Sequence, residues 1–246
     1  LDRSSAASDV YKRQLGEEVA EYHRVGTSTE LETHLFDATT DYGVPTLYAV
    51  QTSQVDPELA QVVAATCDID PQRALAKIYR ELASLRIALR SHARGPRAQE
   101  IKGQDLTVVG GALADAELSM RHVFDFLLEG ERPVHALDEI GTLPASRPGA
   151  GGSADSAGSA GPDPLEQVVA NLERAGAEAI VVDITTDEAR QVGMHVIKAL
   201  IPEAMPLSFS HHARYLATPR LYEAPRAMGL TVHDEAGINP VRQPFA

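Results

Sequence analysis

Cysteines, clustered basic residues and long apolar runs are scarce or missing in this chain. Its 246 residues include one cysteine, Cys67, so an internal disulfide is excluded. No apolar run approaches the roughly 20 residues that a helix needs to span a bilayer, and the formal net charge is −13 without any Lys/Arg-rich block. Because phosphate backbones bind clustered cations, these features argue against nucleic-acid and membrane partners and favour a reducing cytoplasm.

Common catalytic motifs are missing as well. The sequence has no GxGxxG, P-loop, CxxC, HExxH or GxSxG pattern, so it gives no support for a standard dinucleotide site, phosphate loop, zinc site or serine-hydrolase elbow. His211 and His212 lack a third ligand at a known metal spacing, so we expect no metal there. Cys67 lacks a local Cys/His signature, and we expect it to be a small buried residue.

The N-terminal half shows clear strand and helix patterns. With 43% apolar residues, the chain can build a real core. We predict two adjacent strands, Thr33–Ala38 and Pro45–Val50, joined as a hairpin by turn residues 41–43, and a third strand at 61–66.

The strongest helix signal begins at Asp70, an N-cap residue, with Pro71 at the first helical position, and it continues to about Ser91. Its apolar residues recur at spacings of three and four and therefore form one buried stripe: Leu75, Ile78, Leu82, Leu85 and Leu89. A second helix is predicted from Leu113 to Leu128.

The C-terminal third repeats the alternation of helix and strand. We predict a helix from Pro164 to about Ala175, ended by Gly176, and a strand at 179–184, a unit that indicates an α/β or α+β fold. Residues 143–164 are rich in Gly, Ala, Ser and Pro and lack bulky apolar groups, so we predict a flexible loop inserted in one domain.

The first 14 residues have neither an apolar core pattern nor the apolar segment of a signal peptide. They are similar to a recurrent artefact of translated sequencing libraries. We therefore expect residues 1–14 to be a non-native leader, and 15–246 to be a partial domain whose N-terminal portion is missing.

Two segments of the chain resemble the YcaO-domain family. One is the helix that begins Asp70-Pro71, continues Ala74-Leu75 and presents Glu81, with Ser84 where the family usually has Gln. The other is C-terminal and consists of residues 219–225, Pro-Arg-Leu-Tyr-Glu-Ala-Pro, followed by the tail 238–246. The resemblance extends over roughly residues 27–246.

The resemblance implies a mixed fold of strands with packed helices, together with ATP and Mg²⁺ as cofactors. It implies a metal contact from Glu81, nucleotide contacts from Ser84 and Arg86, and a catalytic phosphate contact from Arg220. Each charged residue also has a structural alternative. Spacing allows Glu81 to pair with Lys77 on the helix surface. Arg86 could be a surface residue of a helix that holds other arginines, and Arg220 could pair with one of the 35 acidic residues.

In this family, ATP activates a backbone amide of a peptide. A Cys, Ser or Thr side chain of the peptide, or an external sulfide, adds to the carbonyl, whose oxygen then attacks the γ-phosphate and leaves as phosphate. The resemblance thus implies azoline formation or thioamidation of a peptide substrate. It also implies a peptide-recognition or sulfur-delivery partner protein, and it leaves a homodimer open.

Two departures from the family keep other interpretations open. The chain has no Ser-x-x-Glu-x-x-Glu-Arg segment, and its tail has Arg242-Gln243 within the Pro-x-Pro-x-Pro pattern of azoline-forming members. One alternative is a catalytically incomplete YcaO-like protein that binds partners. The other is an unrelated α/β ligand-binding domain or enzyme.

Overall fold

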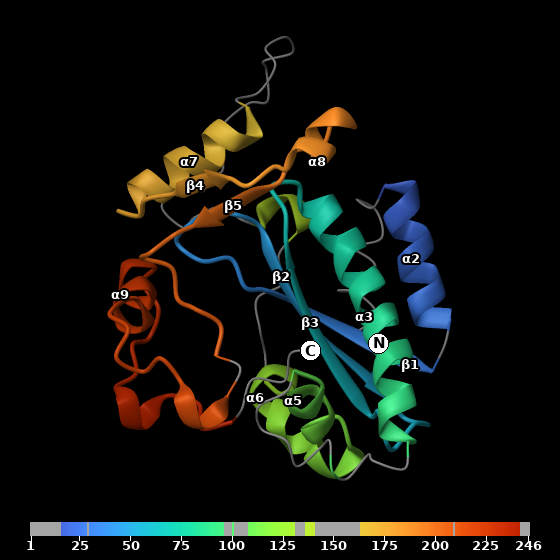
Figure 1. The fold of residues 1–246 in the computed structure, drawn as a ribbon. Coiled ribbons are helices and arrows are strands. Elements are labelled where there is room, and N and C mark those ends of the chain that lie inside the picture. Colours follow the sequence, from blue (N-terminus) through green and yellow to red (C-terminus); the bar gives the residue numbers. More distant parts are fainter. Residues whose placement is uncertain are drawn as a thin grey trace.

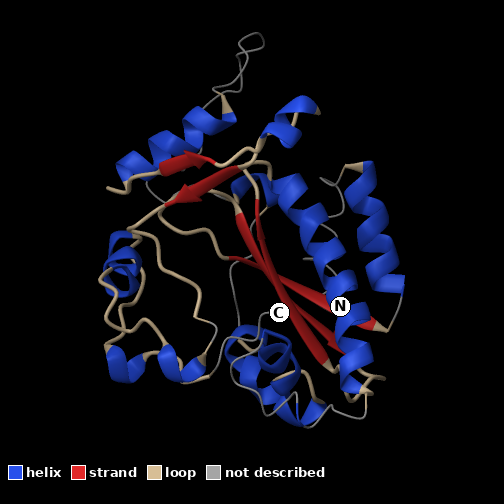
Figure 2. Ribbon diagram, in the orientation of Figure 1, coloured by secondary structure: helices blue, strands red, loops and turns tan. Residues whose placement is uncertain are grey.

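Two antiparallel sheets with surrounding helices make up the fold (Figures 1 and 2). The structure, a computed structural model, describes residues 16–28, 30–95, 100, 108–130, 136–140, 163–208 and 210–241. The predicted leader 1–14, most of the predicted loop 143–164 and the tail residues 242–246 lie outside the described residues.

The larger sheet contains three strands in the order β1-β2-β3: Leu31–Asp37, Thr46–Ser53 and Gln61–Cys67. All neighbours are antiparallel, which confirms the three predicted strands and the hairpin between the first two. The hairpin turns at Gly43, which has a φ of 65° and donates its N–H to the Thr40 carbonyl at 2.9 Å. Glycine adopts this left-handed conformation without a steric penalty.

Helix α3, Pro71–Ala93, covers one face of this sheet and confirms the strongest helix prediction. The Asp70 side chain caps it by accepting the Gln72 N–H at 2.9 Å. The predicted stripe faces the sheet, and four of its five residues are almost fully buried: Leu75, Ile78, Leu82 and Leu89. Each such side chain stabilises the fold by about 1.5–3 kcal/mol. Helix α2, Glu17–Ser28, packs beside α3 (Figure 1).

The opposite face of the sheet is buried as well. Successive strand residues point to opposite faces, so Val62 belongs to the α3 side and Val63 to the other. There, Val50 and Val63 pack with Val123 and Phe124. Cys67, predicted to be buried, is exposed, because it is the last residue of β3 and the burial of that strand ends before it.

The predicted helix 113–128 is wrong as one continuous element. The structure has α5 (Val108–Ala114), a 3-10 helix η1 (Leu118–Phe124) and α6 (Asp125–Leu128). The break at 115–117 has a physical cause, because these backbone carbonyls bond outside any helix. The Gln61 side chain donates to the carbonyls of Asp115 and Glu117 at 2.6 and 2.9 Å, and the Gln61 N–H donates to the carbonyl of Ala116 at 3.1 Å.

The C-terminal part forms the smaller sheet and its helices. Helix α7, Pro164–Arg174, begins at Pro164 and is followed by Gly176, as predicted, and the Asp163 side chain caps it. The predicted strand is present as β4, Ile180–Asp183, and pairs antiparallel with β5, Ile197–Leu200. The remaining short elements are η2 (Leu137–Glu139), α8 (Asp187–Gln191), η4 (His211–Ala213), α9 (Arg220–Ala227) and η5 (Glu235–Gly237).

Antiparallel pairing in both sheets makes this an α+β fold, which is one of the two classes that the sequence predicted. Among the helices in the described ranges, none combines the length and hydropathy that a bilayer crossing needs.

Candidate functional site

Arg220, the first residue of α9, is joined to the turn between β1 and β2. Its Nη1 donates to Oδ2 of Asp41 at 3.1 Å, and its Nη2 donates to Oδ1 of the same carboxylate. The two residues are 179 positions apart in the chain, and each side chain is only 16% exposed. This is a bidentate, charge-assisted pair, the strongest kind of arginine–carboxylate contact.

Tyr42 supports the same guanidinium from its face. The Cζ atom of Arg220 lies 3.7 Å from the centroid of the Tyr42 ring, close enough for a cation–π contact. Burial raises the pKa of Tyr42, Arg220 opposes that rise, and the carboxylates of Asp41 and Glu203 add to it. The edge and the face of the Arg220 side chain are therefore both fixed by the β1–β2 turn.

Local structure explains why Arg220 reaches this turn. Pro219 precedes the first helical residue of α9, and the Tyr222 hydroxyl donates to the Leu216 carbonyl at 2.8 Å. This hydrogen bond joins α9 to the segment that precedes it. The start of α9 is thus anchored where Arg220 leaves the backbone.

Arg86 lies in a different environment, because its side chain extends from α3 and is buried against the larger sheet. It is 7% exposed, and it donates to the Gln51 side chain from Nε at 2.5 Å, to the Gln51 carbonyl from Nη2 at 3.1 Å and to the Leu59 carbonyl from Nη1 at 2.9 Å. Burial lowers the pKa of Arg86 to about 10, which Asp56 opposes and Arg90 reinforces. Arg86 is therefore not a surface residue, and each of its side-chain nitrogens bonds within the protein.

Two more arginines lie on the same side of the structure, one on α3 and one at its C-cap. Arg90 pairs with Asp56 at 3.3 Å, and Arg94 pairs with Glu58 at 3.0 Å. Both acidic residues lie in the connection between β2 and β3. Together with Arg86, these pairs tie α3 to that connection.

Glu81 and Ser84 lie three residues apart on α3 and are both exposed. Lys77, the partner that spacing offered to Glu81, bonds instead to Asp68, with 2.7 Å between Nζ and Oδ2. Glu81 forms no ion pair with another described residue. Its carboxylate is accessible to an ion or ligand from solution.

The structure does not bring the predicted site residues together. Glu81, Ser84 and Arg86 share α3, whereas Figure 1 shows α9, which carries Arg220, on the other side of the larger sheet. No group of three His, Cys, Asp or Glu side chains in the described part of the chain is placed to hold a metal. Mg²⁺ needs only one or two protein carboxylates when phosphates and water complete its shell, so Glu81 fits as one such ligand.

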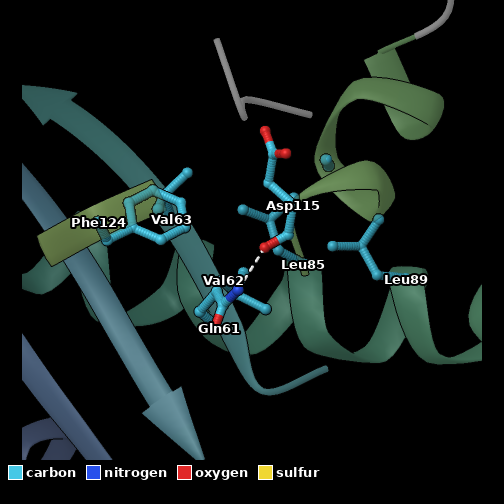
Figure 3. Close-up of a pocket in the computed structure, with 8 residues that line it drawn as sticks. Gln61, Val62, Val63, Leu85, Leu89, Asp115 and Phe124 are labelled. Carbon is cyan, nitrogen blue, oxygen red and sulfur yellow. Dashed lines mark hydrogen bonds between the residues drawn. The ribbon is translucent and has the colours of Figure 1, made fainter. Parts of the chain in front are cut away.

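A small pocket lies between β3, α3 and α5 (Figure 3). It has room for about one water molecule. Its lining is mostly apolar, with Gln61 and Asp115 as the polar members, and it includes neither Glu81 nor Arg220. It is too small for a nucleotide or a peptide.

Asp41 and Tyr42 are the residues that sequence reasoning missed. Both were interpreted only as turn residues between two strands. The many acidic residues of the chain made an ion pair the structural alternative for Arg220 but could not identify its partner, because the pair closes across 179 positions.

Comparisons with known proteins identify the family. A family model described as "YcaO cyclodehydratase, ATP-ad Mg2+-binding" matches residues 6–205, most of the chain. The chain belongs to the YcaO family, which confirms the resemblance and excludes the alternative of an unrelated α/β protein. The matched residues include Glu81, Ser84 and Arg86, whereas Arg220 lies beyond them.

Solved structures show the same fold. A structure described as "Heterocyclase in complex with substrate and Cofactor" aligns with a TM-score of 0.60 and 17% identity, covering 94% of this chain and 28% of that chain. The structure of the heterocyclase TruD aligns with a TM-score of 0.57 at the same identity and coverage. This chain thus spans about 28% of the length of these two proteins. No curated protein matches it.

Proposed function

We propose that the full-length protein uses Mg-ATP to activate backbone amides of a peptide substrate, as a cyclodehydratase-type enzyme. The family match over residues 6–205 is the observation that carries this proposal, because the matched family is described as a cyclodehydratase that binds ATP and Mg²⁺. When bound, ATP supplies the phosphoryl group that turns an amide oxygen into a good leaving group.

Arg220 is the proposed phosphate-binding residue and the proposed catalytic residue. Asp41 uses two of the five N–H donors of its guanidinium, so three remain for phosphate oxygens. A fixed arginine disperses the charge that develops during phosphoryl transfer without a reorganisation cost at that moment.

On α3, Glu81 is the proposed Mg²⁺ ligand and Ser84 a proposed nucleotide contact, since both side chains are exposed one helical turn apart. Arg86 is the third α3 residue that the resemblance assigns to the nucleotide. Its three hydrogen bonds within the protein would have to break for a direct phosphate contact, so we assign it the role of holding α3 in place.

The family description favours ring closure by a Cys, Ser or Thr side chain of the peptide, which gives an azoline. Thioamidation needs an external sulfide and is the second reaction of this proposal. A peptide-recognition or sulfur-delivery partner, a homodimer and a cytoplasmic location belong to the same proposal.

A second candidate is a YcaO protein that binds a partner or nucleotide without turnover. Two observations favour it: Ser84 stands where the resemblance expects Gln, and Glu81 and Arg220 belong to different helices, α3 and α9, which Figure 1 shows apart from each other.

The test is made on the full-length protein in two steps. Calorimetry measures Mg-ATP binding, and a phosphate-release assay with synthetic peptides rich in Cys, Ser and Thr measures turnover, with loss of water from the peptide followed by mass spectrometry. We expect Arg220→Gln to lower turnover roughly ten- to a hundredfold, the effect of losing about 1.5–3 kcal/mol of charge-assisted contact. Arg226→Gln, at an exposed position on the same helix, is the matched control.

The outcomes separate the candidates. Peptide-dependent phosphate release supports the enzyme, and Mg-ATP binding without such release supports the second candidate. Absence of Mg-ATP binding contradicts both nucleotide-based roles.

A further inference from the structure

The ion pair between Asp41 and Arg220 is more buried than an ordinary surface ion pair, and more contacts hold it. Both side chains are 16% exposed, whereas the other arginines in described ion pairs are at least 52% exposed. The carboxylate meets the guanidinium through two nitrogens, Nη1 and Nη2, and the ring of Tyr42 covers its face.

In this geometry, the N–H groups along one edge of the guanidinium do not bond to Asp41. The hydrogen bonds to Asp41 account for one N–H on Nη1 and one on Nη2. The Nε–H and one further N–H on each terminal nitrogen are left, and no other described hydrogen bond uses them. Nε and its neighbouring terminal nitrogen form a fork that matches two oxygens of a phosphate group.

We propose that Asp41 is a positioning residue that fixes Arg220 so that this remaining edge receives a phosphate group, with Tyr42 holding the plane of the guanidinium. This inference rests on the proposed nucleotide role of Arg220 and adds the residue through which that role is set. Asp41 acts through Arg220 and does not touch the nucleotide itself.

A role in which Asp41 competes with phosphate for Arg220 predicts the opposite effect of removing Asp41. If phosphate competed with Asp41 for the same nitrogens, the carboxylate would hold Arg220 away from the ligand, and its removal would strengthen binding. If Asp41 positions Arg220, its removal frees the guanidinium to take other rotamers and weakens binding, because ordering the side chain then costs entropy at the moment of binding.

The experiment measures binding to the full-length protein by calorimetry. The probe is the Mg²⁺ complex of a non-hydrolysable β,γ-imido analogue of ATP. We expect Asp41→Asn and Arg220→Gln each to raise Kd about tenfold, and the double variant to be no weaker than Arg220→Gln alone. Such non-additivity is the signature of a residue that acts through another. Glu223→Gln, an exposed carboxylate on α9, should leave Kd unchanged.

Chemical denaturation of each variant separates a positioning role from a purely structural one. If the pair were only structural, its loss would lower stability without the non-additive rise in Kd. If Asp41→Asn does not fold, Asp41→Glu serves instead, because it keeps the charge but moves the carboxylate outward by one methylene. We expect its Kd to rise at least about threefold with little loss of stability.

The failures are distinguishable. An unchanged Kd in Arg220→Gln contradicts the proposed nucleotide role of Arg220. A weakened Arg220→Gln together with an unchanged or tighter Asp41→Asn overturns the positioning role alone and leaves the proposed function standing. An unchanged Asp41→Glu likewise overturns positioning, as do losses in the two single variants that add in the double variant.

Discussion

Replacing Arg86 by Met should cost this fold a large share of its stability. Met has a similar length and a helix propensity close to that of Arg, so the change removes the charge and the hydrogen bonds while keeping the helix. Three acceptors lose their donor: the side-chain oxygen of Gln51, its carbonyl, and the carbonyl of Leu59.

The magnitude follows from two opposing contributions. Three charge-assisted hydrogen bonds at about 1.5–3 kcal/mol each would total about 4.5–9 kcal/mol if they were independent. Burial of the guanidinium, which lowers its pKa to about 10, opposes this gain, and Met carries no such desolvation cost. We therefore expect Arg86→Met to lower the free energy of unfolding by about 2–4 kcal/mol.

Urea denaturation gives the measurement, with an unchanged m-value showing that the midpoint reports stability. The matched control is Arg80→Met, an exposed position on the same helix, for which we expect a change below about 0.5 kcal/mol. The reasoning is refuted if Arg86→Met is as stable as this control. If the variant also binds Mg-ATP more weakly while remaining stable, Arg86 contacts the nucleotide directly rather than holding α3.

Two further predictions concern stability. Gln61→Leu should lower the free energy of unfolding by about 1–3 kcal/mol, because the carbonyls of Asp115 and Glu117 lose a buried donor, and urea denaturation measures this loss. For Asp68, burial acts to raise the pKa, but Lys77 and nearby donors outweigh it, so the folded-state pKa lies below the ordinary value. The stability that this carboxylate contributes is present above about pH 4 and is lost as pH falls through the folded-state pKa, so Asp68→Asn should flatten acid-unfolding curves below about pH 4.

Exposed positions supply the controls for both. Gln167→Leu on α7 should leave the unfolding midpoint nearly unchanged, and Asp187→Asn on α8 should leave the shape of the acid-unfolding curve unchanged. A Gln61→Leu variant as stable as the parent would show that the break at 115–117 does not depend on the Gln61 side chain. An Asp68→Asn curve that overlays the parent would contradict the assigned pKa shift.

Local signals made part of this fold predictable. Helix α3 carries its cap, its first-turn proline and its apolar stripe within one segment, so residues close in sequence decide it. The hairpin of β1 and β2 is equally local, with a glycine at the position whose φ is 65°.

Features that depend on distant partners could not be predicted in the same way. The apolar pattern of 113–128 suits a helix, but Gln61, 54 positions before Asp115, bonds the carbonyls at which the helix breaks. The other arginines on its helix likewise made Arg86 a candidate surface residue, whereas its partners Gln51 and Leu59 lie 35 and 27 positions away. The partner of Arg220 required the folded chain, because no sequence rule joins positions 41 and 220.

Arg220 and Glu81, the two main residues of the candidate site, differ in how firmly the protein holds their side chains. Arg220 is held by two charge-assisted hydrogen bonds and an aromatic ring before any ligand arrives, whereas Glu81 is an exposed residue of α3. Preorganised groups contribute most to stabilising a transition state. Arg220, which Asp41 and Tyr42 hold in place, is therefore a better anchor for a nucleotide than Glu81 is.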